Sequence, residues 1–189
     1  MLFKICKKNN VKLIQFSSDC VFSGRRGFYS ENDYPDPLDI YGKSKFLGEL
    51  DSDQCITIRK SAIGHEINSK NGLLEWFLAQ NQSVEGYRNA IFSGLTVLEL
   101  SKIIDKYIIP NPDLKGIVHI ASEPISKYNL LRTIAKDYKK EIKVKKNETI
   151  KFIVNTVVGA GGGGGWGGWG GGGRGGRGRG GGGGGGRGG

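Results

Sequence analysis

The sequence predicts an α/β fold with parallel strands, and two observations carry this prediction. Short segments rich in β-forming residues alternate along the chain with longer segments of helical spacing. Successive strands joined by a helix normally pair in parallel. The distribution of glycines marks the expected end of the folded domain, because 24 of the 33 lie between Gly159 and Gly189. We therefore expect one folded domain over residues 1–158, followed by a disordered, glycine- and arginine-rich tail over residues 159–189.

The first half of this domain is expected to run helix, strand, loop, helix, strand. Residues 2–10 have helical spacing, and residues 11–16 are rich in β-formers. Glycines and prolines then interrupt regular structure and predict a long polar loop. Asp39 is a favourable N-cap for a helix over residues 40–50, and residues 54–59 form the next predicted strand.

The second half contains three predicted helices and one strand. Each helix begins at a favourable capping residue. The caps are Asn68 or Ser69 for the first helix, Thr96 with Glu99 as a capping box for the second, and Ser126 for the third. These helices are expected to reach about residues 78, 107 and 138, and a short apolar strand covers residues 116–121.

Composition excludes several classes of protein. No apolar run approaches the roughly 20 residues that cross a bilayer, and charge interrupts the N-terminal segment before a signal-peptide core forms. Cys6, Cys20 and Cys55 lack any Cys-x-x-Cys pairing, which favours a reducing, cytoplasmic location. His65 and His119 each stand alone, so we expect no metal site and a structural or surface role for both.

Tyr41 and Lys45 form the first part of a candidate catalytic group. They are four residues apart on a predicted helix, so both side chains emerge on one face. A neighbouring ammonium favours the phenolate and makes a tyrosine a usable proton donor for a carbonyl. Ser18, after the preceding strand, could hydrogen-bond the same substrate oxygen. The alternative for a Tyr-x-x-x-Lys pair by itself is a chance pair on a helix surface.

The order of motifs around these residues carries a resemblance. Residues 13–24 contain Ser17-Ser18-Asp19-Cys20, residues 29–37 follow, and residues 41–49 read Tyr-Gly-Lys-Ser-Lys-Phe-Leu-Gly-Glu. This set resembles the extended short-chain dehydrogenase/reductases, most closely the sugar-nucleotide branch typified by dTDP-4-dehydrorhamnose reductase. The segments 58–64, 71–78 and 93–96 are similar to that branch as well, and the resemblance covers roughly residues 1–146.

The resemblance implies a partial Rossmann-like parallel sheet with flanking helices, and an NADP(H)- or NAD(H)-dependent reduction of a keto-sugar nucleotide. It implies that Tyr41 gives the proton, that Lys45 assists it and holds the nicotinamide ribose, and that Ser18 polarises the carbonyl. Asp19 would touch the nucleotide-sugar substrate, and a homodimer is an expected assembly. Cys20 stands where these reductases often have tyrosine, and Ala62 where they often have tryptophan, so the sugar stays open.

The chain lacks the family's Gly-x-x-Gly-x-x-Gly turn, which holds the cofactor pyrophosphate. Its first strand already resembles the one that leads to the catalytic serine. We therefore expect no tight NADPH binding and no full activity from this chain, an unpaired apolar edge on that strand, and poor solubility. A fragment of a longer reductase is the favoured explanation, and a genuinely short protein, for example a dimerising pseudo-enzyme, is the alternative.

The tail indicates a second class of function. Arg174, Arg177, Arg179 and Arg187 stand among glycines, and this pattern resembles the arginine-glycine segments of RNA-binding proteins. Trp166 and Trp169 would add stacking surfaces, and binding would be weak and nonspecific. The alternative is a flexible low-complexity linker. The basic run over residues 139–146 is interpreted as a solvated strand face.

Overall fold

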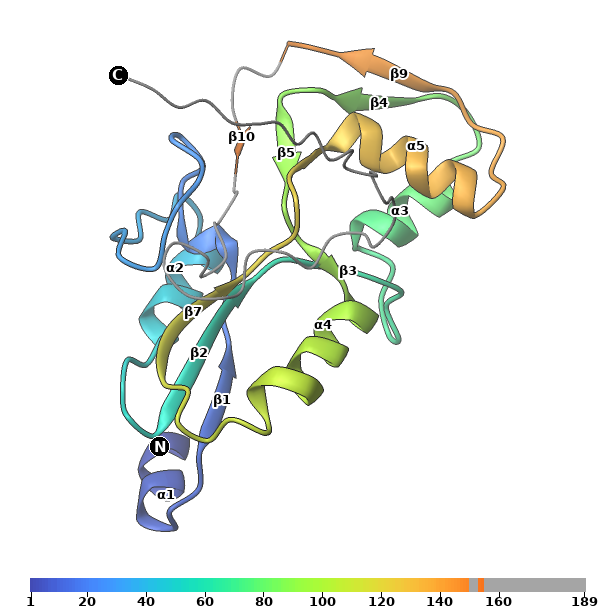
Figure 1. Cartoon of the computed structure of the whole chain (residues 1–189). Coiled ribbons are helices and arrows are strands. Elements are labelled where there is room, and N and C mark those ends of the chain that lie inside the picture. The colour runs from blue at the N-terminus through green and yellow to red at the C-terminus, as the bar shows by residue number, and fades with distance from the viewer. Residues whose placement is uncertain (150–152, 155–189) are drawn as a thin grey trace, which may run out of the picture.

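The computed structural model describes residues 1–149 and 153–154, and it has the expected α/β architecture (Figure 1). Its main sheet has the order β1 (Leu13–Phe16), β2 (Cys55–Lys60), β7 (Gly116–Ile120), with all pairs parallel. Thus β2 is the central strand, buried along most of its length. The prediction of parallel strands connected by helices is confirmed.

Side chains alternate between the two faces of this sheet, and a different part of the chain covers each face. On one face, Ile56 and Ile58 of β2 pack with Ile108 of η2 (Ile104–Ile108), a π-helical continuation of α4 (Val97–Ile103). On the other face, Thr57 and Arg59 bond to Leu50 and Glu49, which follow α2 (Ile40–Gly48). The segment that ends α2 therefore lies against the face opposite η2.

A second group of elements alternates in the chain with those of the main sheet and has its own core. Leu74 and Phe77 of α3 (Leu73–Ala79), Val84 of β4 (Val84–Tyr87) and Leu131 and Ile134 of α5 (Lys127–Asp137) bury one another. Three small sheets belong to this part of the structure: β4 with β9 (Val144–Asn147), β3 (Ala62–Ile63) with β6 (Leu95–Thr96), and the order β10 (Ile153–Val154), β5 (Ala90–Phe92), β8 (Ile125–Ser126).

Helical spacing and N-cap residues in the sequence predicted the positions of most helices correctly. α1 covers Leu2–Lys8. Three predicted N-caps are confirmed: Asp39, Thr96 and Ser126 accept hydrogen bonds from the backbone N–H groups of Gly42, Glu99 and Asn129. β9 carries two exposed central residues, as expected for a solvated strand face, whereas β4 and β5 were not predicted.

The predicted cap of α3 is wrong. The helix begins at Leu73 after Gly72, and neither Asn68 nor Ser69 caps it. Instead, Glu66 Oε2 accepts hydrogen bonds from the N–H groups of Asn71, at 2.7 Å, and Gly72, at 3.0 Å. A carboxylate from the preceding loop thus serves the start of the helix, a contact that spacing along the chain did not indicate.

β1 lies at an edge of its sheet, since it pairs with β2 alone among the strands that the structure describes. Phe16 at its end is 42% exposed. This agrees with the expectation of an apolar edge. None of the helices in the described part of the chain has the length and apolar character needed to span a bilayer. The proposed boundary at residue 158, the tail and its arginines lie outside the described residues, so those expectations stay predictions.

Candidate active site

Helix α2 presents the predicted pair, Tyr41 and Lys45. Tyr41 is half exposed, and Lys45 Nζ lies 5.7 Å from the centre of its ring. Lys45 Nζ also donates to the backbone oxygen of Phe16, at 3.5 Å, so it reaches the end of β1. The helix begins at this point because the Asp39 carboxylate accepts from the Gly42 N–H at 2.6 Å. The structure therefore places both side chains on one helix face, beside the C-terminal end of an edge strand.

Ser18 follows β1 directly and starts a short 3₁₀ helix, η1 (Asp19–Val21). Its backbone is extended, and its hydroxyl forms two hydrogen bonds. Oγ accepts from the Cys20 N–H at 3.1 Å and donates to Asp19 Oδ1 at 3.2 Å. The side chain is buried, so few orientations are open to the hydroxyl. Ser18 thus occupies a fixed position at the carboxyl end of the sheet, where parallel α/β sheets bind their ligands.

A glycine contact brings α2 onto η1. A Cβ atom built at Gly42 would collide with the backbone oxygen of Cys20 and lie 2.9 Å from Cβ of Pro37. Only a residue without a side chain permits this approach. The contact brings the helix that carries Tyr41 and Lys45 against the segment that begins with Ser18. The three side chains do not hydrogen-bond to one another in the part of the chain that the structure describes.

Asp19 is the fourth predicted site residue, and it is buried next to Ser18. Its Oδ1 accepts from Ser18 Oγ and lies 3.7 Å from Cys20 Sγ. Burial raises the pKa of this carboxyl above its ordinary value, and the hydrogen bonds from Ser18, Cys20 and Ser61 oppose that shift only in part. An acid whose charged form is disfavoured beside the candidate serine is typical of a functional site.

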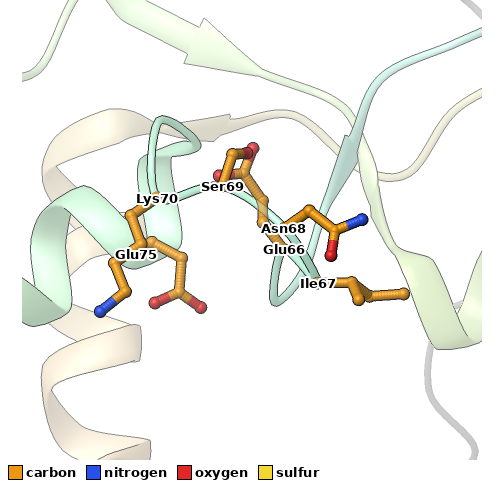
Figure 2. A pocket seen from close by; sticks show the side chains of 6 residues that line it. All are labelled: Glu66, Ile67, Asn68, Ser69, Lys70 and Glu75. Atoms are coloured by element: carbon orange, nitrogen blue, oxygen red, sulfur yellow. The ribbon is translucent and has the colours of Figure 1, made fainter.

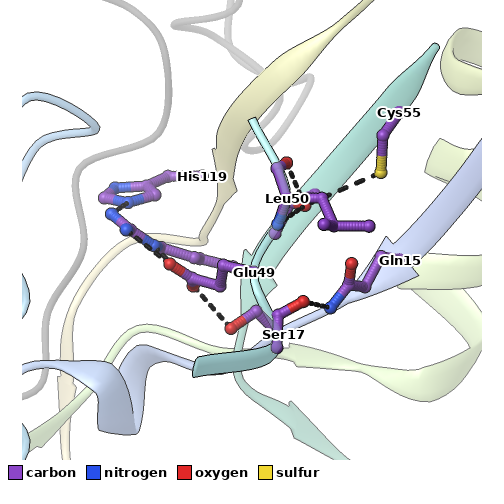
Figure 3. A network of polar contacts seen from close by, with 9 residues as sticks. Gln15, Ser17, Glu49, Leu50, Cys55 and His119 are labelled. Atoms are coloured by element: carbon purple, nitrogen blue, oxygen red, sulfur yellow. Dashed lines mark hydrogen bonds and ion pairs between the residues drawn. The ribbon is translucent and has the colours of Figure 1, made fainter. Parts of the chain in front are cut away.

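A buried polar network connects the C-terminal end of α2 to the main sheet (Figure 3). The sequence pattern did not predict this network. Arg59 of β2 bonds Glu49 through Nε to Oε1 at 2.8 Å and through Nη2 to Oε2 at 2.7 Å. Ser17 Oγ donates to Glu49 Oε1 at 2.6 Å. His119 of β7 lies 3.4 Å from Arg59, measured from Nε2 to Nη1. The network links α2, β1, β2 and β7. Glu49 and Arg59 lie in the segments 41–49 and 58–64, but their positions in the sequence did not indicate that they pair.

The two histidines have different positions. His119 is buried within this network, and Phe22 packs edge-on against its ring. His65 lies on the surface after β3, where Nδ1 is 2.6 Å from Glu75 Oε1 and Nε2 is 2.9 Å from the Tyr138 hydroxyl. Both positions agree with the structural or surface roles expected.

The loop between β3 and α3 forms a shallow pocket (Figure 2). It is lined by Glu66, Ile67, Asn68, Ser69, Lys70 and Glu75. Both of its carboxylates already have partners, since Glu66 binds the start of α3 and Glu75 binds His65. We therefore assign the pocket a structural role in shaping this loop.

Comparison with known proteins shows which families the chain resembles. Residues 1–85 match the RmlD substrate binding domain. The chain is 31% identical over 127 residues to dTDP-4-dehydrorhamnose reductase from Aggregatibacter actinomycetemcomitans, which covers 62% of this chain and 43% of that protein. Methionine adenosyltransferase 2 subunit beta from Danio rerio is 60% identical over 37 residues, 20% of this chain and 12% of the relative.

Solved structures share the fold of this chain. dTDP-4-dehydrorhamnose reductase from Bacillus anthracis, solved in complex with NADP, superposes with a TM-score of 0.67 at 23% identity, over 79% of this chain and 58% of that one. The chain is thus similar to sugar-nucleotide reductases of the short-chain dehydrogenase/reductase family. It spans less than half the length of the curated relatives that it matches.

The residues present fit one end of the dinucleotide cofactor of this family. Tyr41 and Lys45 lie together beside the carboxyl end of the sheet, where the nicotinamide ribose of a reductase could contact the ammonium. Within residues 1–149, no strand leads into a helix through the family's Gly-x-x-Gly-x-x-Gly turn. The described residues can therefore hold the nicotinamide end, and they do not supply the usual pyrophosphate cradle.

Proposed function

We propose that this chain contributes the catalytic and substrate-binding residues of an NADP(H)- or NAD(H)-dependent reductase that acts on a keto-sugar nucleotide. The observation that supports the proposal is the close approach of Gly42 in α2 to Cys20 in η1. This contact brings the helix that carries Tyr41 and Lys45 against the segment that begins at Ser18. The similarity to dTDP-4-dehydrorhamnose reductase supports this reaction class.

The proposed chemistry assigns one task to each residue. The Ser18 hydroxyl donates a hydrogen bond to the substrate carbonyl oxygen and orients it. Tyr41 gives its phenolic proton to that oxygen, while the Lys45 ammonium stabilises the phenolate that remains. Lys45 would also hold the ribose of a nicotinamide cofactor, which would supply the hydride chemistry when bound. Asp19 contacts the sugar beside Ser18.

The reaction is tested by following oxidation of NADPH and NADH at 340 nm with a panel of keto-sugar nucleotides. We expect Tyr41→Phe, Lys45→Met and Ser18→Ala each to lower kcat by roughly 10²- to 10⁴-fold. Tyr34→Phe is the matched control, because Tyr34 is an exposed tyrosine outside α2. Equal losses for Tyr34→Phe and Tyr41→Phe would refute the assigned role of Tyr41.

Location and assembly complete the proposal. A cytoplasmic enzyme that forms a homodimer fits the composition and the family. The alternative of RNA binding depends on the tail, and deletion of residues 159–189 separates the two classes. Reductase activity should survive this deletion, whereas any RNA retention by the tail should be lost with it.

A further inference from the structure

Lys60, which no motif singled out, lies at the carboxyl end of the central strand. It is the last residue of β2, and it pairs with Ile120 of β7. Phe16 is opposite Ile58, and the Ser17 N–H bonds the Ile58 oxygen at 2.8 Å, so the ladder continues past the end of β1. Continuing this register through the extended backbone of Ser18 sets Ser18 level with Lys60.

The faces of the sheet support this placement. Ser17 and Arg59 both bond Glu49, so they share one face. Side chains alternate along a strand, and directly opposed residues of parallel neighbours point the same way. Ser18 and Lys60 therefore share the other face, on adjacent strands that are about 4.8 Å apart. Lys60 thus belongs to the neighbourhood of the candidate serine.

The charge of Lys60 is unusual in its surroundings. The side chain is half-buried, and within residues 1–149 it forms no hydrogen bond or ion pair. Burial and the nearby Lys45 ammonium lower its pKa, and the attraction of Asp19 opposes them only in part. The Asp19 oxygen is already used by Ser18 and Cys20. An ammonium that is partly desolvated and has no direct counter-ion costs free energy unless an anion binds there.

We propose that Lys60 binds a phosphate group of a ligand at the carboxyl end of the β1-β2-β7 sheet. The proposal deepens the proposed function, and it rests on that function for the identity of the ligand. Both ligands of such a reductase carry a pyrophosphate, so the phosphate belongs to the nucleotide sugar or to the dinucleotide cofactor. Lys60 is then a specificity-determining residue and not a proton donor.

The test uses inorganic pyrophosphate as the probe, at constant ionic strength, with the full chain and isothermal titration calorimetry. We expect Lys60→Gln to raise the Kd by about tenfold, since the charged hydrogen bond is lost. Lys60→Arg should keep most of the affinity. Lys43→Gln is the matched control, because Lys43 is an exposed lysine of the same helix as Lys45. Its Kd should equal that of the wild type.

Two further arms identify the source of the phosphate. A rise in Kd for dTDP but not NADP⁺ in Lys60→Gln assigns the contact to the nucleotide sugar, and the reverse pattern assigns it to the cofactor. Melting temperatures show that each variant is folded, and Lys60→Met replaces Lys60→Gln if the latter unfolds. Absence of pyrophosphate binding by the wild type, or an equal loss in Lys43→Gln, would overturn the proposal.

These results are independent of turnover. Pyrophosphate binding that depends on Lys60, in a chain that reduces no keto-sugar nucleotide, would retain the phosphate site and reject the proposed reaction. Reductase activity of the wild type, with ligand affinities unchanged in Lys60→Gln, would support the proposed reaction and reject the phosphate site.

Discussion

Glu49 and Arg59 form a bidentate ion pair that ties the end of α2 to the central strand of the sheet. The pair is almost completely buried, with 4% of the Glu49 side chain and 2% of the Arg59 side chain exposed. The Arg59 guanidinium also lies over the ring of Phe22, 5.0 Å from its centre. Because β2 ends at Lys60 and α2 carries Tyr41, this pair connects the two sides of the candidate site.

Breaking this pair should destabilise the protein strongly. Removing one partner leaves the other charge buried, which costs about 3–5 kcal/mol, so Arg59→Met and Glu49→Gln should each lower the free energy of unfolding by about that amount. The double variant Glu49→Leu/Arg59→Met should lose less than the sum of the single changes. Urea denaturation of the four proteins measures both effects. Lys115→Met removes the exposed pair with Asp53 and should leave the midpoint nearly unchanged.

Two glycines of α2 should respond in opposite directions to alanine. Gly42→Ala would push Cβ into the Cys20 oxygen, so we expect a loss of about 1–3 kcal/mol and a lower kcat, because α2 moves from η1. Gly48→Ala meets only Nε2 of Gln15, at 3.5 Å, and should be neutral or stabilising by up to ~1 kcal/mol. Thermal denaturation and activity of both variants check this. Equal tolerance at the two positions would show that the α2–η1 contact is loose.

Asp19 should make stability depend on pH. Its folded-state pKa is raised by burial, so ionisation costs free energy in the folded protein. That cost is absent below the unfolded pKa of about 4 and grows as the pH rises through the folded pKa. Asp19→Asn should therefore gain stability relative to the wild type as the pH increases, while losing activity on the proposed substrate.

The matched control for Asp19 is Asp53→Asn. Lys115 lowers the pKa of Asp53, so the contribution of this carboxylate to stability is lost as the pH falls, and the variant should show the opposite trend. Melting temperatures between about pH 2 and 8 measure both variants, because the Asp53 contribution changes only below the unfolded pKa of about 4. Parallel curves for Asp19→Asn and the wild type would contradict the inferred cost.

The exposed edge of β1 should promote self-association. Phe16 is 42% exposed at the end of a strand that pairs on one side with β2. We expect Phe16→Ser to reduce concentration-dependent association in sedimentation velocity experiments. Tyr34→Ser removes an aromatic side chain that is 81% exposed and lies in the loop before α2, and it should have less effect. A wild-type chain that is monomeric at all concentrations would contradict this prediction.

Local interactions made much of the fold predictable. Asp39, Thr96 and Ser126 start their helices as predicted, because an N-cap acts on N–H groups two or three residues away. The four-residue spacing of Tyr41 and Lys45 sets their common helix face for the same reason. α3 was the exception, since its first N–H groups are served by Glu66, a side chain beyond that range.

The sequence by itself determined the class of fold, the positions of most helices and the candidate residues Ser18, Asp19, Tyr41 and Lys45. Only the tertiary structure decided which distant groups meet. The Glu49–Arg59 pair, the contact of Gly42 with Cys20 and the alignment of Lys60 with Ser18 depend on strand register and helix packing. Periodicity reports the face on which a side chain lies, but not its partner, because the partner is set by packing between elements far apart in the chain.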